Sequence, residues 1–206
     1  MTIGTAIVQK RYELFRWRYG LNVPAKIALA IGIACLTGLL AQVRIVLPFS
    51  PVPITGQTFA VLLAGILLGR WWGGAAMAIY GGLGFAGVPW FNGWTGGMGA
   101  TGGYIIGFVL AALFLGHFTD KYIRARRFFN MLGLMVFASL FLIYVPGLIW
   151  LGLWMNFVTG SPVSIGTLLS MGAVPFIAGD IIKLVAVASL AKAITPKQPY
   201  NTEADK

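Results

Sequence analysis

PAKIALAIGIACLTGLLAQVRIVL, residues 24–47, is the stretch that decides the fold class. It carries charge only at Lys26 and Arg44, near its two ends. Its length exceeds the roughly 20 residues that an α-helix needs to cross the hydrocarbon core of a bilayer. Pro24 suits a first helical turn, and Pro48 prevents the helix from continuing. The run passes Cys35 without a small-residue cleavage site, so we expect a retained transmembrane helix instead of a signal peptide.

The rest of the chain has the same apolar character. Its 206 residues are 58% hydrophobic and 10% charged, with a mean hydropathy of +0.85. Such a chain has too little polar surface for a water-soluble globule. The breaks between apolar stretches are too short to hold a separate soluble domain. We therefore predict an all-α integral membrane protein with six transmembrane helices, at 24–47, 55–69, 73–88, 101–116, 131–157 and 175–194.

Three segments follow from this pattern. Residues 1–23 mix basic and aromatic side chains, which is typical of a short interfacial helix in the headgroup layer. Residues 24–194 form the six-helix transmembrane domain, in which Pro146 is expected to kink one helix. A short amphipathic piece at 164–172 precedes the last helix. Residues 195–206 form a polar C-terminal tail.

The distribution of basic residues predicts the orientation. With six spans, all of the 15 lysines and arginines except Arg44 and Lys183 fall on the side of the two termini. The positive-inside rule then places both termini in the cytoplasm of a multi-pass protein of the cell membrane. The cations lie between apolar segments instead of clustering on a folded surface, so the formal net charge of +10 does not indicate a nucleic-acid partner.

One acid and one cation lie within the predicted hydrocarbon region, Asp180 and Lys183 of the last helix. A charge there costs at least about 2.5–3.5 kcal/mol on insertion scales, so such residues indicate function. Their i, i+3 spacing puts them on one helix face, where they can neutralise each other. A structural pair that merely fixes the last helix is the alternative interpretation.

Further polar side chains fall at the same outer ends of the predicted helices. Each alone is also compatible with a helix cap or an interface anchor, but together they predict a cavity. Carboxylate, ammonium, amides and aromatic rings beside apolar walls suit a small, partly apolar molecule with a polar ring better than an inorganic ion. These side chains are Arg44, Thr55, Gln57, Thr58, Asn92, Thr101 and Tyr104.

Motifs for catalysis are missing from the sequence. The single histidine, His117, lies beside arginines in a predicted cytoplasmic loop. There is no Cys/His metal set, no Gly-x-Ser-x-Gly elbow and no His-Glu-x-x-His pair. No phosphate-binding loop follows a strand. We therefore expect a protein that is not an enzyme and that needs no metal or cofactor.

Four stretches carry a family resemblance: 55–65 (TGQTFAVLLAG), 87–91 (GVPWF), 101–108 (TGGYIIGF) and 175–183 (PFIAGDIIK). In this order they resemble the BioY family, the biotin-binding S components of energy-coupling factor (ECF) vitamin importers. The resemblance implies a high-affinity membrane subunit that captures biotin from outside. It also implies ATP-driven uptake with a membrane coupling (T) protein and cytoplasmic ATPases as partners. One departure is Ala100, where the family usually has proline.

The resemblance also implies roles for individual residues. Asp180 and Lys183 become the main polar contacts to the ureido ring of biotin. The other substrate-binding candidates are Gln57, Tyr104, Asn92, Arg44, Thr58 and Thr101. The small residues Ala30 and Ala34 are expected to dock the coupling protein. Two alternatives stay open: an S component for another vitamin or precursor, and a structural membrane protein without a transport role.

Overall fold

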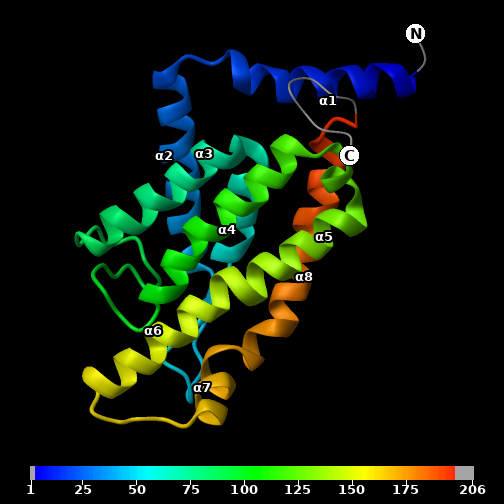
Figure 1. Cartoon of the computed structure of the whole chain (residues 1–206). Coiled ribbons are helices and arrows are strands. Elements are labelled where there is room, and N and C mark those ends of the chain that lie inside the picture. Colours follow the sequence, from blue (N-terminus) through cyan, green and yellow to red (C-terminus); the bar gives the residue numbers. More distant parts are fainter. Residues whose placement is uncertain (1–2, 198–206) are drawn as a thin grey trace.

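The structure is a computed structural model that describes residues 3–197; the rest of the predicted tail, 198–206, lies outside the described residues. It is a bundle of helices (Figure 1). The helices are α1 (Ile3–Gly20), α2 (Val23–Gln42), α3 (Gln57–Phe85), α4 (Gly102–Lys121), α5 (Phe128–Phe137), α6 (Tyr144–Phe157), α7 (Ile165–Gly172) and α8 (Val174–Ile194). A 3-10 turn η1 (Ile123–Arg126), a π-helical segment η2 (Ala138–Ile143) and a two-stranded ribbon, β1 (Arg44–Ile45) with β2 (Ile54–Thr55), complete the described elements.

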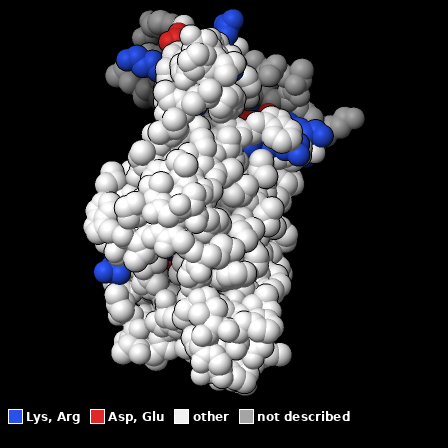
Figure 2. All heavy atoms as spheres, turned by 90° about the vertical axis from the view of Figure 1, so that its left-hand side faces the viewer, with Lys and Arg blue, Asp and Glu red and all other residues white. Residues whose placement is uncertain are grey.

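The described residues contain five helical segments that are long and apolar enough to cross a membrane. Charged side chains avoid a broad band on the face shown in Figure 2, and most of the visible lysines and arginines gather at one end. This confirms the prediction of a mostly helical, multi-pass membrane protein. The five segments are Val23–Gln42, Gln57–Phe85, Gly102–Lys121, Phe128–Phe157 and Ile165–Ile194.

The longest of the numbered helices, α3, is broken near its middle. Gly69 has a φ of 78° and a ψ of −176°, a backbone conformation that glycine adopts without the steric cost of a Cβ. The chain turns back there, because a Cβ built on Gly73 would lie 2.8 Å from the Cα of Gly65. The helix therefore runs as two closely packed arms, 57–68 and 70–85, with the break where the sequence predicts a hairpin.

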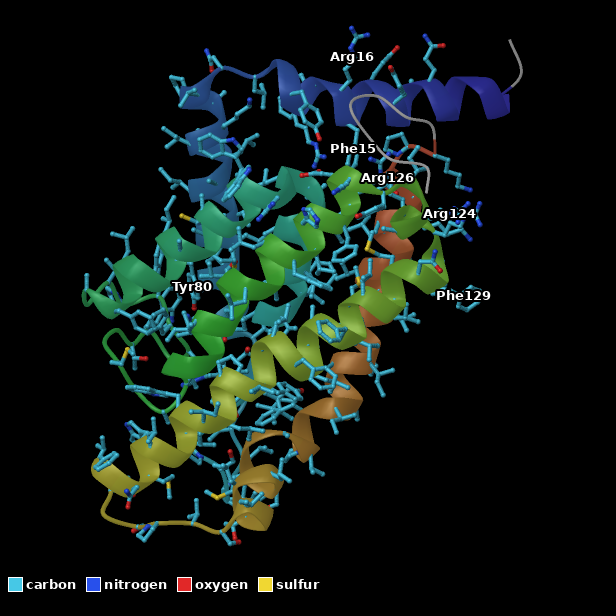
Figure 3. The ribbon with its side chains drawn as sticks, viewed as in Figure 1. Phe15, Arg16, Tyr80, Arg124, Arg126 and Phe129 are labelled. Atoms are coloured by element: carbon cyan, nitrogen blue, oxygen red, sulfur yellow. The ribbon has the colours of Figure 1, made fainter. Side chains whose placement is uncertain are left out.

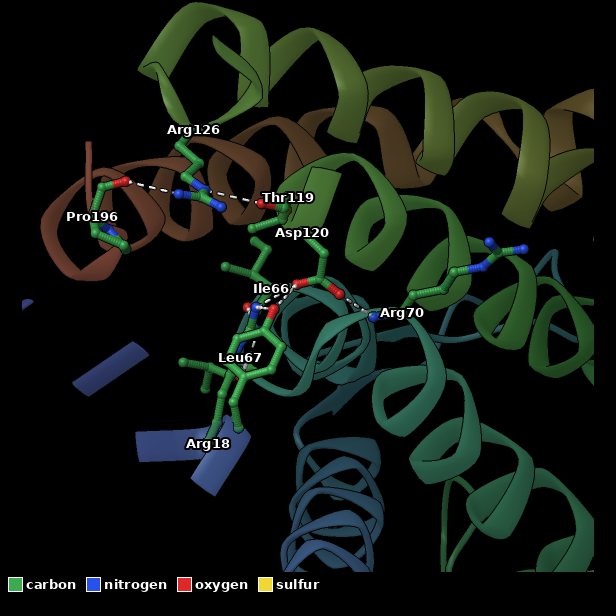
Figure 4. A network of polar contacts seen from close by, with 9 residues as sticks. Arg18, Ile66, Leu67, Arg70, Thr119, Asp120, Arg126 and Pro196 are labelled. Carbon is green, nitrogen blue, oxygen red and sulfur yellow. Dashed lines mark hydrogen bonds and ion pairs between the residues drawn. The ribbon is translucent and has the colours of Figure 1, made fainter. Parts of the chain in front are cut away.

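A polar network closes the ends of the two arms (Figure 4). Arg18 of α1 donates Nη1 to the carbonyl oxygens of Ile66 and Leu67, at 3.1 and 3.2 Å. The backbone N–H of Arg70 donates to Oδ2 of Asp120 at 2.9 Å, and Arg18 forms an ion pair with Oδ1 of the same carboxylate. Arg18 thus places a positive charge at the carbonyl end of the first arm, and Asp120 places a negative charge at the N–H end of the second arm. The network holds α1 across this end of the bundle.

The small-residue face of α2 points inward. Ala30 and Ala34 have no exposed surface, and α2 packs against α3, as small side chains allow between membrane helices. The predicted docking face therefore lies inside the subunit, where a partner cannot reach it in this structure. On the opposite side of the helix, Gly32 and Cys35 are exposed.

Two boundaries differ from the predictions. The helix from Pro24 ends at Gln42, because the next residue, Val43, leaves the helical conformation with a ψ of 88°. The side chain of Gln42 ties this end to the loop between α3 and α4, donating Nε2 to the Phe91 carbonyl at 2.9 Å and accepting the Trp94 N–H at 3.1 Å. The chain then enters the ribbon, in which Arg44 pairs with Thr55. Helix α4 continues to Lys121, so much of the predicted loop at 117–130 is helical.

The predicted kink at Pro146 is replaced by an irregular segment just before it. Residues 128–157 form one continuous span, and η2 occupies 138–143. Proline has no N–H and its ring clashes with the carbonyl four residues earlier, which is Leu142 here. The wider π turn accommodates this clash and the missing hydrogen bond. In the next span, α7 and α8 lie where the sequence places them, with Pro175 in the first turn of α8.

Candidate functional site

A cavity lies between β2 and the helices α3, α4, α6 and α8, away from α1. It contains about 490 Å³ of empty space, including its open mouth. The part of this space that the centre of a water molecule can reach is about 50 Å³, which is enough for a few water molecules. Its lining combines apolar side chains with polar and charged ones. The lining residues are Val52, Pro53, Thr55, Gln57, Thr58, Asn92, Thr101, Tyr104, Ile105, Phe108, Tyr144, Phe176, Asp180 and Lys183.

The two predicted charges meet at this cavity. Asp180 is only 5% exposed, and its Oδ1 lies 2.5 Å from Nζ of Lys183. The ammonium also donates to the carbonyl oxygen of Thr55 at 3.0 Å. An ammonium has three N–H donors, so one donor of Lys183 remains for a ligand. The pair has no net charge, which makes it tolerable inside a membrane.

The second oxygen of Asp180 is held by two hydroxyl groups. Oδ2 accepts from the Tyr144 hydroxyl at 2.5 Å and from Ser139 Oγ at 3.2 Å. Residues five positions apart on a regular α-helix point about 140° away from each other. Here the backbone N–H of Tyr144 bonds to the carbonyl of Ser139, an i to i−5 bond typical of a π turn. Segment η2 therefore aims both hydroxyls at one carboxylate oxygen.

Gln57, the first residue of α3, is fixed by its own neighbours. Its Oε1 accepts from Thr55 Oγ1 at 2.8 Å, and its Nε2 donates to the Tyr80 hydroxyl at 2.6 Å. The indole of Trp90 donates Nε1 to the backbone carbonyl of Tyr80 at 3.0 Å. A side-chain amide has two N–H donors and two lone pairs. One donor and one lone pair of Gln57 are therefore still available in the cavity.

Tyr104 forms part of the wall instead of offering a free hydroxyl. Its O–H donates to the carbonyl of Gly172 at 2.7 Å, which ties α4 to the end of α7. Its ring meets Tyr144 edge-on, with centroids 6.4 Å apart. A Cβ on Gly147 would overlap the Tyr104 ring, so glycine is required there. Tyr104 thus supplies an aromatic surface to a ligand.

Comparison with known proteins identifies the family. The model of the BioY family matches residues 13–200. The chain belongs to the BioY family. It is 54% identical over 147 residues to the probable biotin transporter BioY of Methanothermobacter thermautotrophicus, covering 69% of this chain and 94% of that protein. It is 36% identical to the biotin transporter BioY of Thermotoga maritima, covering 70% and 82% of the two chains.

A solved structure shares the BioY fold. The crystal structure of the S-component for biotin from an ECF-type ABC transporter superimposes with a TM-score of 0.70 and 25% sequence identity. The match covers 82% of this chain and 89% of the other. The helical membrane architecture is therefore that of an S component.

All the substrate-binding residues predicted for this BioY chain line the cavity, except Arg44. Arg44 is exposed in β1, and its guanidinium lies against Gly93, where a Cβ would overlap it. It therefore lies beside the loop that carries Asn92, outside the cavity lining. The lining residues that the sequence predicted are Gln57, Thr58, Asn92, Thr101, Tyr104, Asp180 and Lys183.

Two hydroxyl groups that hold Asp180 were not predicted from the sequence. Tyr144 and Ser139 are polar residues in the middle of an apolar span, which was the available signal. They are five residues apart in the sequence, a spacing that places two residues on different faces of a regular α-helix. Only the π turn brings them to the same face. Thr55 was predicted as one of the polar side chains around a cavity, and in the structure its carbonyl oxygen also accepts a hydrogen bond from Lys183.

Proposed function

We propose that this chain is the biotin-binding S component of an ECF vitamin importer, which captures biotin from outside the cell for ATP-driven uptake. The Asp180 and Lys183 pair carries the proposal. It lines a cavity that has space beside it, and one ammonium N–H is unused. A pair with only a structural role needs no such space. The names of the relatives, all biotin transporters among those compared above, support biotin as the ligand.

The chemistry of the cavity fits biotin. A ureido ring has two N–H donors and one carbonyl acceptor. Oδ2 of Asp180 is already occupied by two hydroxyl groups, and Oδ1 has one lone pair left beside Lys183, which can accept from one of the N–H donors. The free N–H of Lys183 can donate to the carbonyl. Phe108 and Phe176 offer apolar surface to the hydrocarbon part of the fused rings. The valerate carboxylate then points to the mouth, toward Asn92 and Arg44. This is binding without catalysis, so the subunit is not an enzyme.

The finer topology follows from the break in α3. If each arm crosses the membrane, the five apolar segments become six spans. The end that carries α1 also carries most of the basic side chains, so the positive-inside rule makes it cytoplasmic. Both termini are then cytoplasmic, α1 lies in the inner headgroup layer, and the cavity opens toward the outside of the cell membrane. The partners of this subunit are a membrane coupling protein and cytoplasmic ATPases.

Biotin titration of a paired variant tests the proposal. Asp180→Asn alone would leave a buried ammonium without its partner, which destabilises the fold. The double change Asp180→Asn with Lys183→Gln removes both charges together, so the protein should still unfold near the wild-type temperature. We expect wild type to bind biotin at sub-micromolar concentration and the double variant to bind at least about 100-fold more weakly, since two charge-assisted hydrogen bonds are lost.

The control is a second acid and base at the same i, i+3 spacing, Lys10→Gln with Glu13→Gln on the exposed surface of α1. It should bind biotin like wild type. A folded wild type without sub-micromolar biotin affinity would exclude the proposal, and competition by thiamine or riboflavin would point to another vitamin. A paired variant that binds biotin normally would make the ion pair purely structural.

A further inference from the structure

A second cavity lies at the opposite end of the bundle, beside α1. It contains about 1050 Å³ of empty space, including its opening. Two separate segments supply its walls, η1 with the residue after it, and the chain just beyond α8. Among the residues that the structure describes, the lining consists of Ile123, Arg124, Arg126, Arg127 and Lys197, four of which are basic.

These cations are held in two different ways. Arg126 is 1% exposed; it donates Nε to the Thr119 carbonyl at 2.9 Å and Nη1 to the Pro196 carbonyl at 3.3 Å (Figure 4). It thereby fixes the end of α8 against η1. Within residues 3–197, the side chains of Arg124, Arg127 and Lys197 form no ion pair or hydrogen bond. Their charges therefore face the cavity without compensation from the described residues.

An apolar groove adjoins the basic cavity. Its empty space is about 750 Å³, including its opening. Arg124 lines both the basic cavity and the groove. The groove runs from the end of α4 along the start of α5. Gly133 is exposed in it, and a Cβ there would meet nothing within 4 Å. Phe129, 81% exposed, projects from the same side of the bundle as Arg124 (Figure 3). The other lining residues are Phe118, Tyr122, Ala125, Asn130 and Leu134.

We propose that this site binds one anionic phospholipid, with its phosphate headgroup in the basic cavity and an acyl chain in the groove. Topology alone explains why cations lie at this end, but not why two segments bring them around one cavity. A basic cavity between transmembrane helices is a recurrent site for anionic headgroups. The adjoining groove offers apolar surface to the acyl chain of the lipid. Neither free phosphate nor an acidic protein segment has an acyl chain to fill this groove.

Lipid retention by the full-length protein tests the headgroup half. Purified protein is delipidated in detergent, mixed with phosphatidylglycerol or phosphatidylcholine, and examined by native mass spectrometry. Wild type should retain phosphatidylglycerol. Each cation near an anionic lipid contributes roughly fivefold in affinity, so Arg124→Gln with Arg127→Gln should weaken retention about 25-fold. The matched control, Lys10→Gln with Arg16→Gln, removes two exposed charges from α1 and should retain the lipid like wild type.

A variant in the groove tests the acyl half. Gly133→Phe should fill the groove and lower phosphatidylglycerol retention at least about fivefold, while biotin binding shows that the protein is folded. Inorganic phosphate at millimolar concentration should not displace the lipid from wild type. Equal retention of phosphatidylcholine, wild-type retention by either site variant, or displacement by phosphate would overturn the proposal. So would an equal loss in the α1 control, which would indicate non-specific charge attraction.

Discussion

The carboxylate of Asp180 accepts more side-chain contacts than its ion pair alone requires. One oxygen holds Lys183, and the other holds Tyr144 and Ser139. An ion pair between two flexible side chains could adopt several geometries. The hydroxyls fix the plane of the carboxylate, so Asp180 presents its one remaining lone pair, on Oδ1, to a ligand in one direction. Binding with a preorganised acceptor costs less ordering entropy.

Removing the Tyr144 hydroxyl should therefore weaken biotin binding without unfolding the protein. Without the hydroxyl, the side chain of Asp180 has to be ordered when the ligand binds, which costs about 0.5–1.5 kcal/mol, so Tyr144→Phe should raise the Kd for biotin roughly two- to tenfold. Isothermal titration calorimetry measures this change. Tyr122→Phe removes a hydroxyl at the other end of the bundle and should leave the Kd unchanged. Wild-type affinity in Tyr144→Phe would show that Asp180 needs no orientation.

At the scale of whole elements, the break in α3 depends on one backbone conformation. Gly69 has a positive φ, and a Cβ on it would lie 2.5 Å from Oδ2 of Asp120. With a φ of 78° and a ψ of −176°, Gly69 adopts a conformation that is essentially restricted to glycine and costs another residue about 1–3 kcal/mol, and the clash adds to this cost. Gly69→Ala should lower the thermal unfolding temperature in detergent.

Gly82→Ala is the matched control in the same helix. Its Cβ would meet nothing within 4 Å, and alanine is favoured over glycine inside a helix by about 1 kcal/mol. It should unfold at the same temperature as wild type or higher. Equal unfolding temperatures for the two variants would mean that the turn between the arms tolerates a side chain.

The outer face of α2 is the element that we expect to meet the coupling protein, now that Ala30 and Ala34 are found buried. Gly32 is exposed there, and a Cβ on it would meet nothing within 4 Å. Gly32→Trp should reduce co-purification with the coupling protein and leave biotin binding by the isolated subunit unchanged. Ile149→Trp, at an exposed residue of α6, is the control. Normal co-purification of Gly32→Trp with the coupling protein would mean that the interface lies on another helix.

At the scale of the molecule, the separation of charge predicts which end faces the cytoplasm. In a Cys35→Ala background, Ser161→Cys lies in the loop between α6 and α7 and should react with a membrane-impermeant maleimide on intact cells. Arg16→Cys on α1 should react only after the cells are permeabilised. The reverse pattern would place the cavity on the cytoplasmic side.

The sequence allowed the apolar spans, their proline starts and the Asp180 and Lys183 pair to be predicted, because hydropathy and i, i+3 spacing are local properties. The hairpin near Arg70 could also be predicted from local sequence, because this charged residue interrupts the apolar stretch. The ribbon of β1 and β2 was not predictable, because each strand has only two residues and shows no readable alternation. It also follows the contact between Gln42 and the loop that carries Phe91 and Trp94. Segment η2 depends on packing around Pro146, so the alignment of Ser139 with Tyr144 needed the structure.

The network at the break in α3 joins a surface helix to the interior of the bundle. Arg18 cannot leave without uncovering the carbonyls of Ile66 and Leu67 and removing the cation beside Asp120. Helix α1 and the hairpin are therefore tied together at this end of the bundle. If α1 lies in the headgroup layer, as proposed above, and the subunit tilts in the bilayer to release its ligand, α1 has to move through that layer with the hairpin. The resistance of that layer would then set part of the barrier to turnover, and the composition of the leaflet around α1 would change the rate.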